Sequence, residues 1–158
     1  MVSKENAKIE VSRLTSHIGF WMRLVSNNVS HAFADKLESS GVTVAEWVIL
    51  REMYGVNDTT SVSRIAELSG LTRGAVSKLI SRLLKKKLVT RKESIGDRRF
   101  QDIELTNIGI MLVPDLAILA DQNDEEFFSI LTKTEREALT ALLKKIVNLH
   151  KFTTMPIN

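Results

Sequence analysis

Apolar residues in the first part of the chain recur every three or four positions. Between Val11 and Leu37 they fall at 14, 18, 21, 22, 25, 29, 32 and 33, which places them on one stripe of a helix. At about 1.5 Å per residue, a helix over this whole range would approach 40 Å in length. Ser39, Ser40 and Gly41 interrupt the pattern. We therefore expect a long first helix that ends before residue 41.

Three further helices are predicted between residues 43 and 87. Thr43-Val-Ala-Glu46 has the spacing of a capping box and starts a helix that reaches about Gly55. After a polar loop at 57–60, two shorter helices cover 62–68 and the stretch from Thr72 to about Lys87. Because Ser69-Gly70-Leu71 separates them, the two short helices are joined by a tight turn.

Two strands and two more helices complete the pattern. Residues 88–93 and 100–105 are predicted strands, the second with apolar and polar residues that alternate, and the turn at 94–99 joins them. Thr106 can cap the following helix, and Thr132-Lys-Thr-Glu135 is a second capping box that opens the last one. The last helix has one apolar side, formed by Leu139, Leu142, Leu143, Ile146 and Leu149.

Residues 62–81 have the spacing of a helix-turn-helix. The small Ala66 lets the two helices approach, Gly70 permits a left-handed turn, and Val76 packs the second helix on the first. An ordinary helical hairpin is the alternative. Packing this face inward leaves a polar and basic set exposed, able to reach bases and phosphates in a DNA major groove: Thr72, Arg73, Gly74, Ser77, Lys78, Ser81 and Arg82.

The turn between the two predicted strands carries a pair of cations. Asp97 follows Gly96, and Arg98 and Arg99 come next. A hairpin tip of this kind beside a recognition helix is a wing, which can place a guanidinium in a neighbouring minor groove. Asp97 would organise the turn or hold an arginine extended. The arginines therefore support DNA binding more specifically than the helices alone.

The charge distribution agrees with this interpretation. The chain carries +3 overall, yet residues 60–99 hold eleven Lys or Arg against three acidic residues, a net +8, which leaves −5 for the rest. A basic middle flanked by acidic ends is typical of a chain in which one region meets a polyanion. A solvated basic face without a partner is the alternative on charge alone.

Other function classes lack positive support in the sequence. The chain has no cysteine, which excludes disulfides and thiolate chemistry, and it has no nucleophile motif, phosphate loop or dinucleotide fingerprint. His17 and His31 are too far apart on one helix to share a metal ion, and the acidic residues 121–126 are more typical of a solvated helix face. We expect no enzyme activity, metal, cofactor or membrane span, and a cytoplasmic location.

The sequence resembles the MarR-type winged-helix transcription factors. The family's wing signature, Asp-x-Arg followed by Leu-Thr and a glycine, is matched by Asp97, Arg99, Leu105, Thr106 and Gly109. The resemblance extends through "GVTVAEWVILREM" at 41–53, "LTRGAVSKLISRLLKKKLV" at 71–89 and "LTKTEREALTALLKKI" at 131–146. It covers nearly the whole chain. Without cysteine, this chain cannot use the thiol-oxidation sensing of some members.

The resemblance implies a regulated DNA-binding protein. In similar proteins, the junction between the long helices and the DNA-binding lobe can hold a small aromatic or phenolic effector, for which the lining candidates here are Trp21, Met22, Phe33 and Trp47. Core packing is the alternative role for these four residues. The implied function is a transcriptional regulator, expected to be a repressor that the effector releases.

We therefore expect a predominantly helical α+β fold in three regions. Residues 1–42 and 106–158 would supply the dimerisation helices, and 43–105 the winged helix-turn-helix. The long apolar stripes imply a homodimer on a pseudo-palindromic operator in double-stranded DNA. The alternatives are a nonspecific architectural DNA-binding protein and a protein-interaction winged helix without DNA binding. The dimerisation candidates are Leu14, Ile18, Leu139, Leu142, Leu143 and Ile146.

Overall fold

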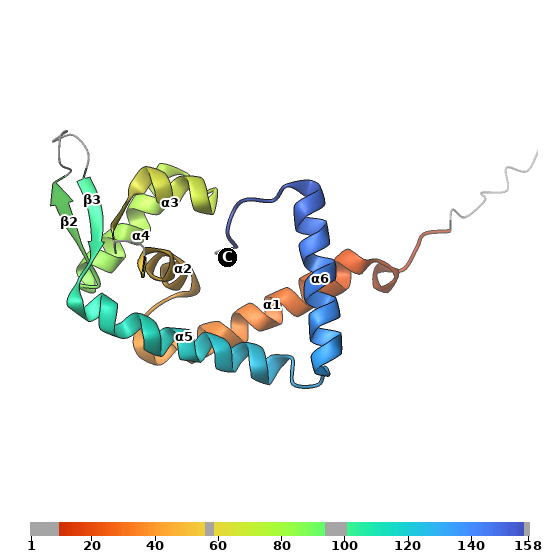
Figure 1. The fold of residues 1–158 in the computed structure, drawn as a ribbon. Coiled ribbons are helices and arrows are strands. Elements are labelled where there is room, and N and C mark those ends of the chain that lie inside the picture. The colour runs from red at the N-terminus through yellow and green to blue at the C-terminus, as the bar shows by residue number, and fades with distance from the viewer. Residues whose placement is uncertain (1–9, 56–58, 94–100, 157–158) are drawn as a thin grey trace, which may run out of the picture.

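The computed structural model describes residues 10–55, 59–93 and 101–156 and shows an elongated, mainly helical molecule (Figure 1). A lobe of short helices and strands lies at one end, and long helices extend away from it. No helix in the described ranges is both long and apolar enough to cross a membrane. In chain order the elements are the 3₁₀ turn η1 (Leu14–Ser16), α1 (Ile18–Leu37), the 3₁₀ turn η2 (Glu38–Ser40), α2 (Val44–Met53), β1 (Thr59–Ser61), α3 (Val62–Ser69), α4 (Arg73–Lys85), β2 (Val89–Glu93), β3 (Gln101–Leu105), α5 (Asn107–Phe127) and α6 (Lys133–His150).

Both predicted capping boxes are confirmed. At the start of α2, Thr43 Oγ1 accepts the Glu46 N–H at 3.3 Å, and Glu46 Oε2 accepts the Thr43 N–H at 2.9 Å. Thr132 and Glu135 form the same pair at the start of α6. There the hydrogen bonds from Thr132 lower the pKa of Glu135 below its ordinary value. These caps satisfy N–H groups that have no partner within the helix, and they define where α2 and α6 begin.

The first helix is shorter than predicted. It begins at Ile18, because His17 is extended, with φ −98° and ψ 125°. Leu14 belongs to the separate turn η1. Two side chains at this turn contact the Arg13 carbonyl oxygen. Ser16 Oγ donates a hydrogen bond to it at 2.7 Å, and the His17 ring nitrogen Nδ1 lies 3.1 Å from it. Such local hydrogen bonds compete with the helical ladder, and periodicity alone does not reveal them.

The sheet has three strands where the sequence predicted two. Its order is β1-β3-β2, with both pairs antiparallel. The additional strand, β1, is Thr59–Ser61, which lies partly in the predicted polar loop. Three polar residues have no apolar alternation to reveal a strand. Pairing with β3, where Thr60 lies opposite Ile103, creates it.

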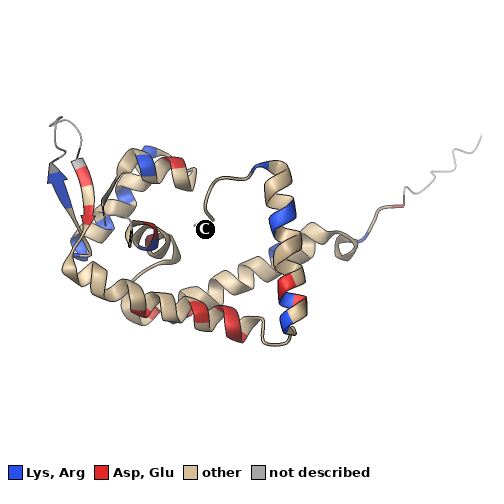
Figure 2. Cartoon of the chain, in the orientation of Figure 1, with Lys and Arg blue, Asp and Glu red and all other residues tan. Residues whose placement is uncertain are grey.

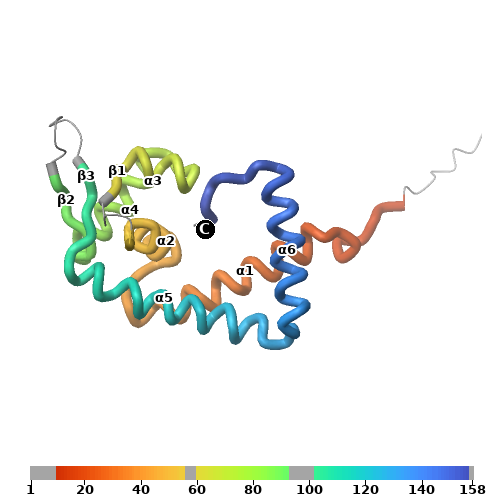
Figure 3. Tube along the Cα trace, viewed as in Figure 1, coloured from red at the N-terminus to blue at the C-terminus, as the bar shows by residue number. Residues whose placement is uncertain are grey.

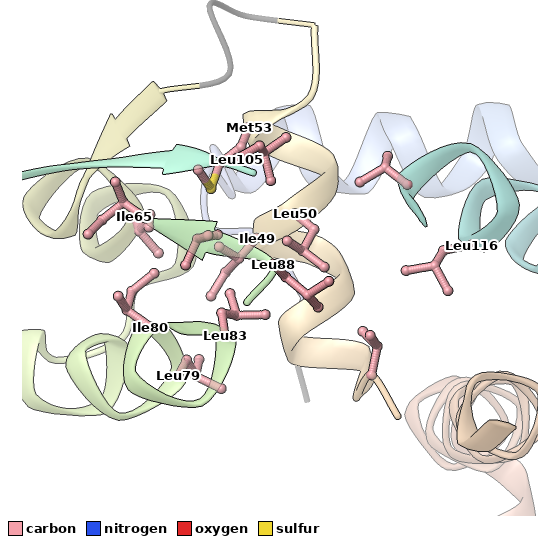
Figure 4. Close-up of a cluster of buried hydrophobic side chains, with 14 of the residues drawn as sticks. Ile49, Leu50, Met53, Ile65, Leu79, Ile80, Leu83, Leu88, Leu105 and Leu116 are labelled. Carbon is pink, nitrogen blue, oxygen red and sulfur yellow. The ribbon is translucent and has the colours of Figure 1, made fainter. Parts of the chain in front are cut away.

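The core lies inside the lobe. Side chains from α2, α3, α4, β2 and β3 meet there, and Val113 and Leu116 of α5 and the end of α1 close it (Figure 4). This arrangement joins the lobe to the long helices through α5. The buried apolar residues are Phe33, Leu37, Val42, Ile49, Leu50, Met53, Ile65, Val76, Leu79, Ile80, Leu83, Leu88, Val89, Ile103, Leu105, Val113 and Leu116.

The long helices are covered far less than the lobe. None of the residues of α6 is buried, and of α1 only Phe33 and Leu37 are. At the junction of α5 and α6, Arg136 makes two hydrogen bonds to Glu125, of 2.5 and 3.1 Å. These bonds and the positive charge of Arg136 lower the pKa of Glu125. The junction therefore holds the start of α6 by a polar contact, while its apolar side remains open.

A second contact returns the chain to the lobe after α6. The segment beyond His150 runs back to α3 (Figure 3), where the Met155 N–H donates to the Leu68 carbonyl at 2.8 Å. This bond satisfies a carbonyl near the end of α3, where intrahelical partners run out. Thr154 packs beside Gly70, since a Cβ added at Gly70 would lie 2.8 Å from its Cγ2. The end of the described chain thus contacts the α3–α4 turn.

We expect Gly109→Ala to destabilise the protein. Gly109 lies in the first turn of α5, where an added Cβ would stand 2.3 Å from the Leu88 carbonyl oxygen. The obstacle is backbone, so α5 or the start of β2 has to move, at a cost of about 1 to 3 kcal/mol. Urea unfolding measures this loss.

Gly19→Ala is the matched control for that prediction. It lies in α1, and a Cβ there would meet nothing within 4 Å, so we expect no loss and a gain of up to about 1 kcal/mol from helix propensity. Equal stability of the two variants would contradict the close approach of α5 to the Leu88 backbone.

Candidate nucleic-acid interface

Helices α3 and α4 form the helix-turn-helix that the spacing predicted. Gly70 adopts φ 68° and ψ 7° in the turn, and its N–H donates to the Ala66 carbonyl at 2.9 Å. Val76 is fully buried and Leu79 is 9% exposed. One side of α4 is thus fixed against the lobe by Val76, Leu79, Ile80 and Leu83.

The opposite side of α4 presents the predicted polar and basic set to solvent. Thr72 is the N-cap, and its Oγ1 accepts the Ala75 N–H at 3.2 Å. Arg73 is the first residue of the helix, so its exposed side chain projects from the end that a groove-reading helix would insert. The predicted residues that are exposed are Thr72, Arg73, Gly74, Ser77, Lys78, Ser81 and Arg82.

Five side chains line an open groove along this face. Four of them, Ser77, Lys78, Ser81 and Arg82, belong to the predicted set, and the fifth is Lys85. Lys85 is not among the predicted residues, although it follows Ser81 by four residues and Arg82 by three, which is the spacing of neighbours on one helix face. The groove is therefore lined by three cations and two hydroxyls.

Figure 2 shows basic residues on the lobe and on α6, whereas the charged residues of α5 are acidic. On β2, Arg91 and Lys92 are exposed, and Lys92 lies 3.6 Å from Glu104 of β3. The sheet thus adds cations on the element that follows α4 in the chain. A polyanion approaching the lobe would meet positive charge from both elements.

The predicted wing tip lies outside the described residues. Asp97, Arg98 and Arg99 belong to 94–100, for which no structure is described. The strands on either side are adjacent, since β2 pairs with β3 from Val89↔Leu105 to Glu93↔Gln101. The predicted hairpin strands are therefore confirmed in pairing, and the role of the two arginines stays a prediction.

The four effector candidates do not gather at one place within the chain. Phe33 and Trp47 pack edge to face with ring centroids 6.2 Å apart, and Phe33 is buried. Trp21 lies twelve positions before Phe33 on α1, half exposed, and its indole N–H donates to the Thr15 carbonyl at 2.9 Å. Met22, beside it, is also exposed. A single site lined by all four would need further surface beyond one chain.

The six dimerisation candidates are all exposed in the single chain. Leu14 and Ile18 are 73% and 76% exposed, and Leu14 borders an open groove along η1 and α1 that also includes Phe20 and Leu24. On α6, Leu139, Leu142, Leu143 and Ile146 are between 39% and 60% exposed. Exposed apolar faces of this extent are typical of surfaces that another chain covers.

The histidines and the acidic residues 121–126 considered as metal ligands form no metal-binding group within the described ranges. No three His, Asp or Glu side chains there cluster closely enough to hold an ion. The His17 ring contacts Ser12 and the Arg13 and Leu14 carbonyls, and Glu125 pairs with Arg136. These contacts give those groups local structural partners.

Comparison with known proteins supports a common family. The MarR family model matches residues 40–99, from the end of η2 to the predicted wing. YwaE of Bacillus subtilis, an uncharacterized HTH-type transcriptional regulator, is 33% identical over 88 residues, 55% of this chain and 52% of its own length. The chain thus spans about half of that relative. MhqR of the same species, an HTH-type transcriptional regulator, is 27% identical over 70% of this chain and 75% of its own.

Solved structures share the fold over most of the chain. Bordetella bronchiseptica BpsR, whose DNA binding is regulated by 6-hydroxynicotinic acid, has a TM-score of 0.76 at 24% identity, covering 87% of this chain and 97% of its own. A mutant of Escherichia coli MarR complexed with operator DNA has a TM-score of 0.76 at 21% identity, covering 87% of this chain and 99% of its own. The MarR family model thus matches the helix-turn-helix segment, and the solved structures show that the chain has the winged-helix fold of these proteins.

Proposed function

We propose that this protein is a sequence-specific, dimeric DNA-binding transcriptional regulator, a repressor that a small aromatic or phenolic effector releases. Residues 43–105 would bind DNA, and 1–42 with 106–158 would form the dimer. The protein would act in the cytoplasm, where it meets DNA. Its resemblance to transcriptional regulators implies no enzyme activity.

One observation carries the proposal: the two sides of α4 differ completely. Its apolar side is locked into the core, and its other side presents a cation at the first helical position and a groove of cations and hydroxyls behind it. Those are the groups that read base edges and phosphates in a major groove.

The wing extends this proposal to the minor groove. We assign Arg98 and Arg99 to contacts there and Asp97 to the organisation of the turn. Support comes from the adjacent strands β2 and β3, which carry residues 94–100 between them. Arginine suits a narrow minor groove because the potential there is strongly negative.

A two-fold dimer would fix the form of the operator. Related recognition helices would enter successive major grooves, about 34 Å apart, so the site would be a pseudo-palindrome. Occupying such a site in a promoter would exclude polymerase. The exposed apolar faces of α1 and α6 support the dimer, and operator binding by the structurally similar MarR supports the DNA partner.

The test of DNA reading is Arg73→Ala. If Arg73 bonds a guanine, its loss should weaken operator binding by about 1 to 3 kcal/mol and leave random DNA little affected. Titration of both DNAs by fluorescence anisotropy measures the two affinities, once the operator has been identified by selection from random sequence.

Lys144→Ala is the control, because it removes a cation from α6, away from the lobe. An equal loss on both DNAs would reduce Arg73 to a phosphate contact. A parent protein without preference would favour an architectural role, and one without DNA binding a protein-interaction role.

The dimer is tested by Leu142→Glu. Leu142 is 60% exposed in the single chain, and a carboxylate placed in an apolar interface should weaken association by about 2 kcal/mol or more. Analytical ultracentrifugation measures the change. Ile130→Glu is the control, since Ile130 is 88% exposed outside the helices. Unchanged dimerisation of the Leu142 variant would remove α6 from the interface.

Effector release is tested through linkage. A ligand coupled to DNA by about 1 to 3 kcal/mol would lower operator affinity roughly 5-fold to 150-fold, and the operator must weaken ligand binding by the same factor. Small aromatic acids and phenols are titrated with and without operator while tryptophan fluorescence is followed. Trp21→Phe and Trp47→Phe separate the two signals. Saturable binding of equal affinity in both conditions would rule out the regulation.

A further inference from the structure

One carboxylate of the lobe, that of Glu46, is buried, and among the described residues it forms an ion pair with Lys86. Glu46, in the first turn of α2, has no solvent exposure. Its Oε2 accepts both the Thr43 N–H of the capping box, at 2.9 Å, and the Nζ of Lys86, at 2.6 Å. Its Oε1 has no hydrogen-bond partner among the described residues. The position of this carboxylate is therefore defined by Thr43 and Lys86.

The cation belongs to the helix that is proposed to read DNA. Lys86 is the C-cap of α4, and its Nζ also donates to the Gly41 carbonyl at 2.6 Å. Gly41 lies between α1 and α2. One ammonium group thus joins three places: the end of α4, the start of α2 and the turn that leads out of α1.

The neighbouring lysines are used differently. Lys85 lines the groove on the exposed face of α4. Lys87 is exposed and takes a left-handed backbone, with φ 59°, and its carbonyl accepts the Thr106 hydroxyl at 2.6 Å. A run of three lysines in a DNA-binding segment suggests three phosphate contacts. Here the middle ammonium is occupied by protein oxygens.

In this ion pair Glu46 is buried while the Lys86 side chain is 35% exposed. Such a pair is a weak source of net stability, because desolvation of the carboxylate opposes the attraction between the charges. The ion pair instead fixes the position of the Lys86 end of α4. Lys86 and Arg73 lie at opposite ends of α4, roughly 20 Å apart at about 1.5 Å per residue. A tilt of about 10° around the Lys86 end would therefore displace Arg73 by about 3 Å, more than the roughly 0.5 Å tolerance of a preorganised contact.

We propose that Lys86 is a positioning residue for DNA recognition: held by Glu46 and the Gly41 carbonyl, it sets the orientation of α4 relative to α1 and α2 and touches no phosphate. This deepens the proposed function and rests on it. Lys86 would act through Arg73 and the groove residues, by keeping them aligned with base edges.

The first experiment detects the contacts of Lys86 with Glu46 and the Gly41 carbonyl in the absence of DNA. The full-length protein is labelled with limiting acetic N-hydroxysuccinimide ester, and the rate at each lysine is followed by mass spectrometry. We expect Lys86 to react at least about tenfold more slowly than Lys85, because its ammonium is engaged by two oxygens. Glu46→Gln should raise the Lys86 rate and leave that of Lys85 unchanged. Equal rates at Lys85 and Lys86 in the parent protein would overturn the proposal.

The second experiment separates positioning from phosphate binding. Lys86→Met should lower operator affinity at least about tenfold and reduce the ratio of operator to random-DNA affinity, while the slope of log affinity against log salt stays that of the parent. Lys85→Met is the comparison, and its slope should fall by about 0.9, the value of one phosphate contact. A similar fall for Lys86→Met would make Lys86 a phosphate ligand and overturn the proposal.

A purely structural role is distinguished by a double variant. Lys86→Met with Glu46→Gln leaves no buried charge and keeps an amide oxygen that can accept the Thr43 N–H, so it should fold even if Lys86→Met alone does not. We expect a melting temperature near that of the parent and a persistent loss of operator selectivity. Recovery of selectivity together with stability would overturn the proposal.

Failure of the proposed function gives a different result. A parent protein that binds no DNA selectively would remove the positioning role along with the function, even if Lys86 still reacted slowly in the labelling experiment. A fast-reacting Lys86 in a parent that does select its operator would instead reject these contacts of Lys86 and leave the function intact.

Discussion

Burial of the apolar side of α4 is the interaction on which the rest of the lobe depends. Val76, Ile80 and Leu83 are almost completely removed from water, at roughly 1.5 to 3 kcal/mol for each such side chain. Rotating α4 about its axis would expose them, so the core dictates which side chains face outward. The polar side of the helix is therefore held as firmly as the core itself, although none of its residues contributes to that core.

Helices α1 and α6, in contrast, bury little apolar surface within one chain. Their apolar residues are present in the right periodicity, yet a single chain leaves the first half of α1 and all of α6 without buried residues. Hydrophobic surface of this kind is stabilised only when something covers it. A second copy is the simplest cover, because a two-fold axis presents each face with a surface of the same character. Lobe and long helices thus differ in how much of their stability one chain can supply.

Local signals predicted the helical elements of this chain well, and contacts between distant residues account for what was missed. Thr43, Thr106 and Thr132 correctly predicted where three helices begin, because capping depends on residues three positions apart. The exposed face of α4 followed from its buried one. Strand β1 could not be predicted, since its polar residues become a strand only by pairing with β3. The Glu46–Lys86 pair is equally invisible to periodicity, because its members are forty residues apart.

The segment after α6 contacts α3 through one backbone hydrogen bond, and hydrogen exchange at its amide can show how often that contact opens. Met155 donates its N–H to Leu68, so that hydrogen exchanges with solvent freely only when the bond opens. Its donor follows α6 and its acceptor belongs to α3, while α6 itself has no buried residue. Exchange at this one position therefore reports how often the segment after α6 leaves α3, a quantity that the cooperative unfolding of the core does not reveal.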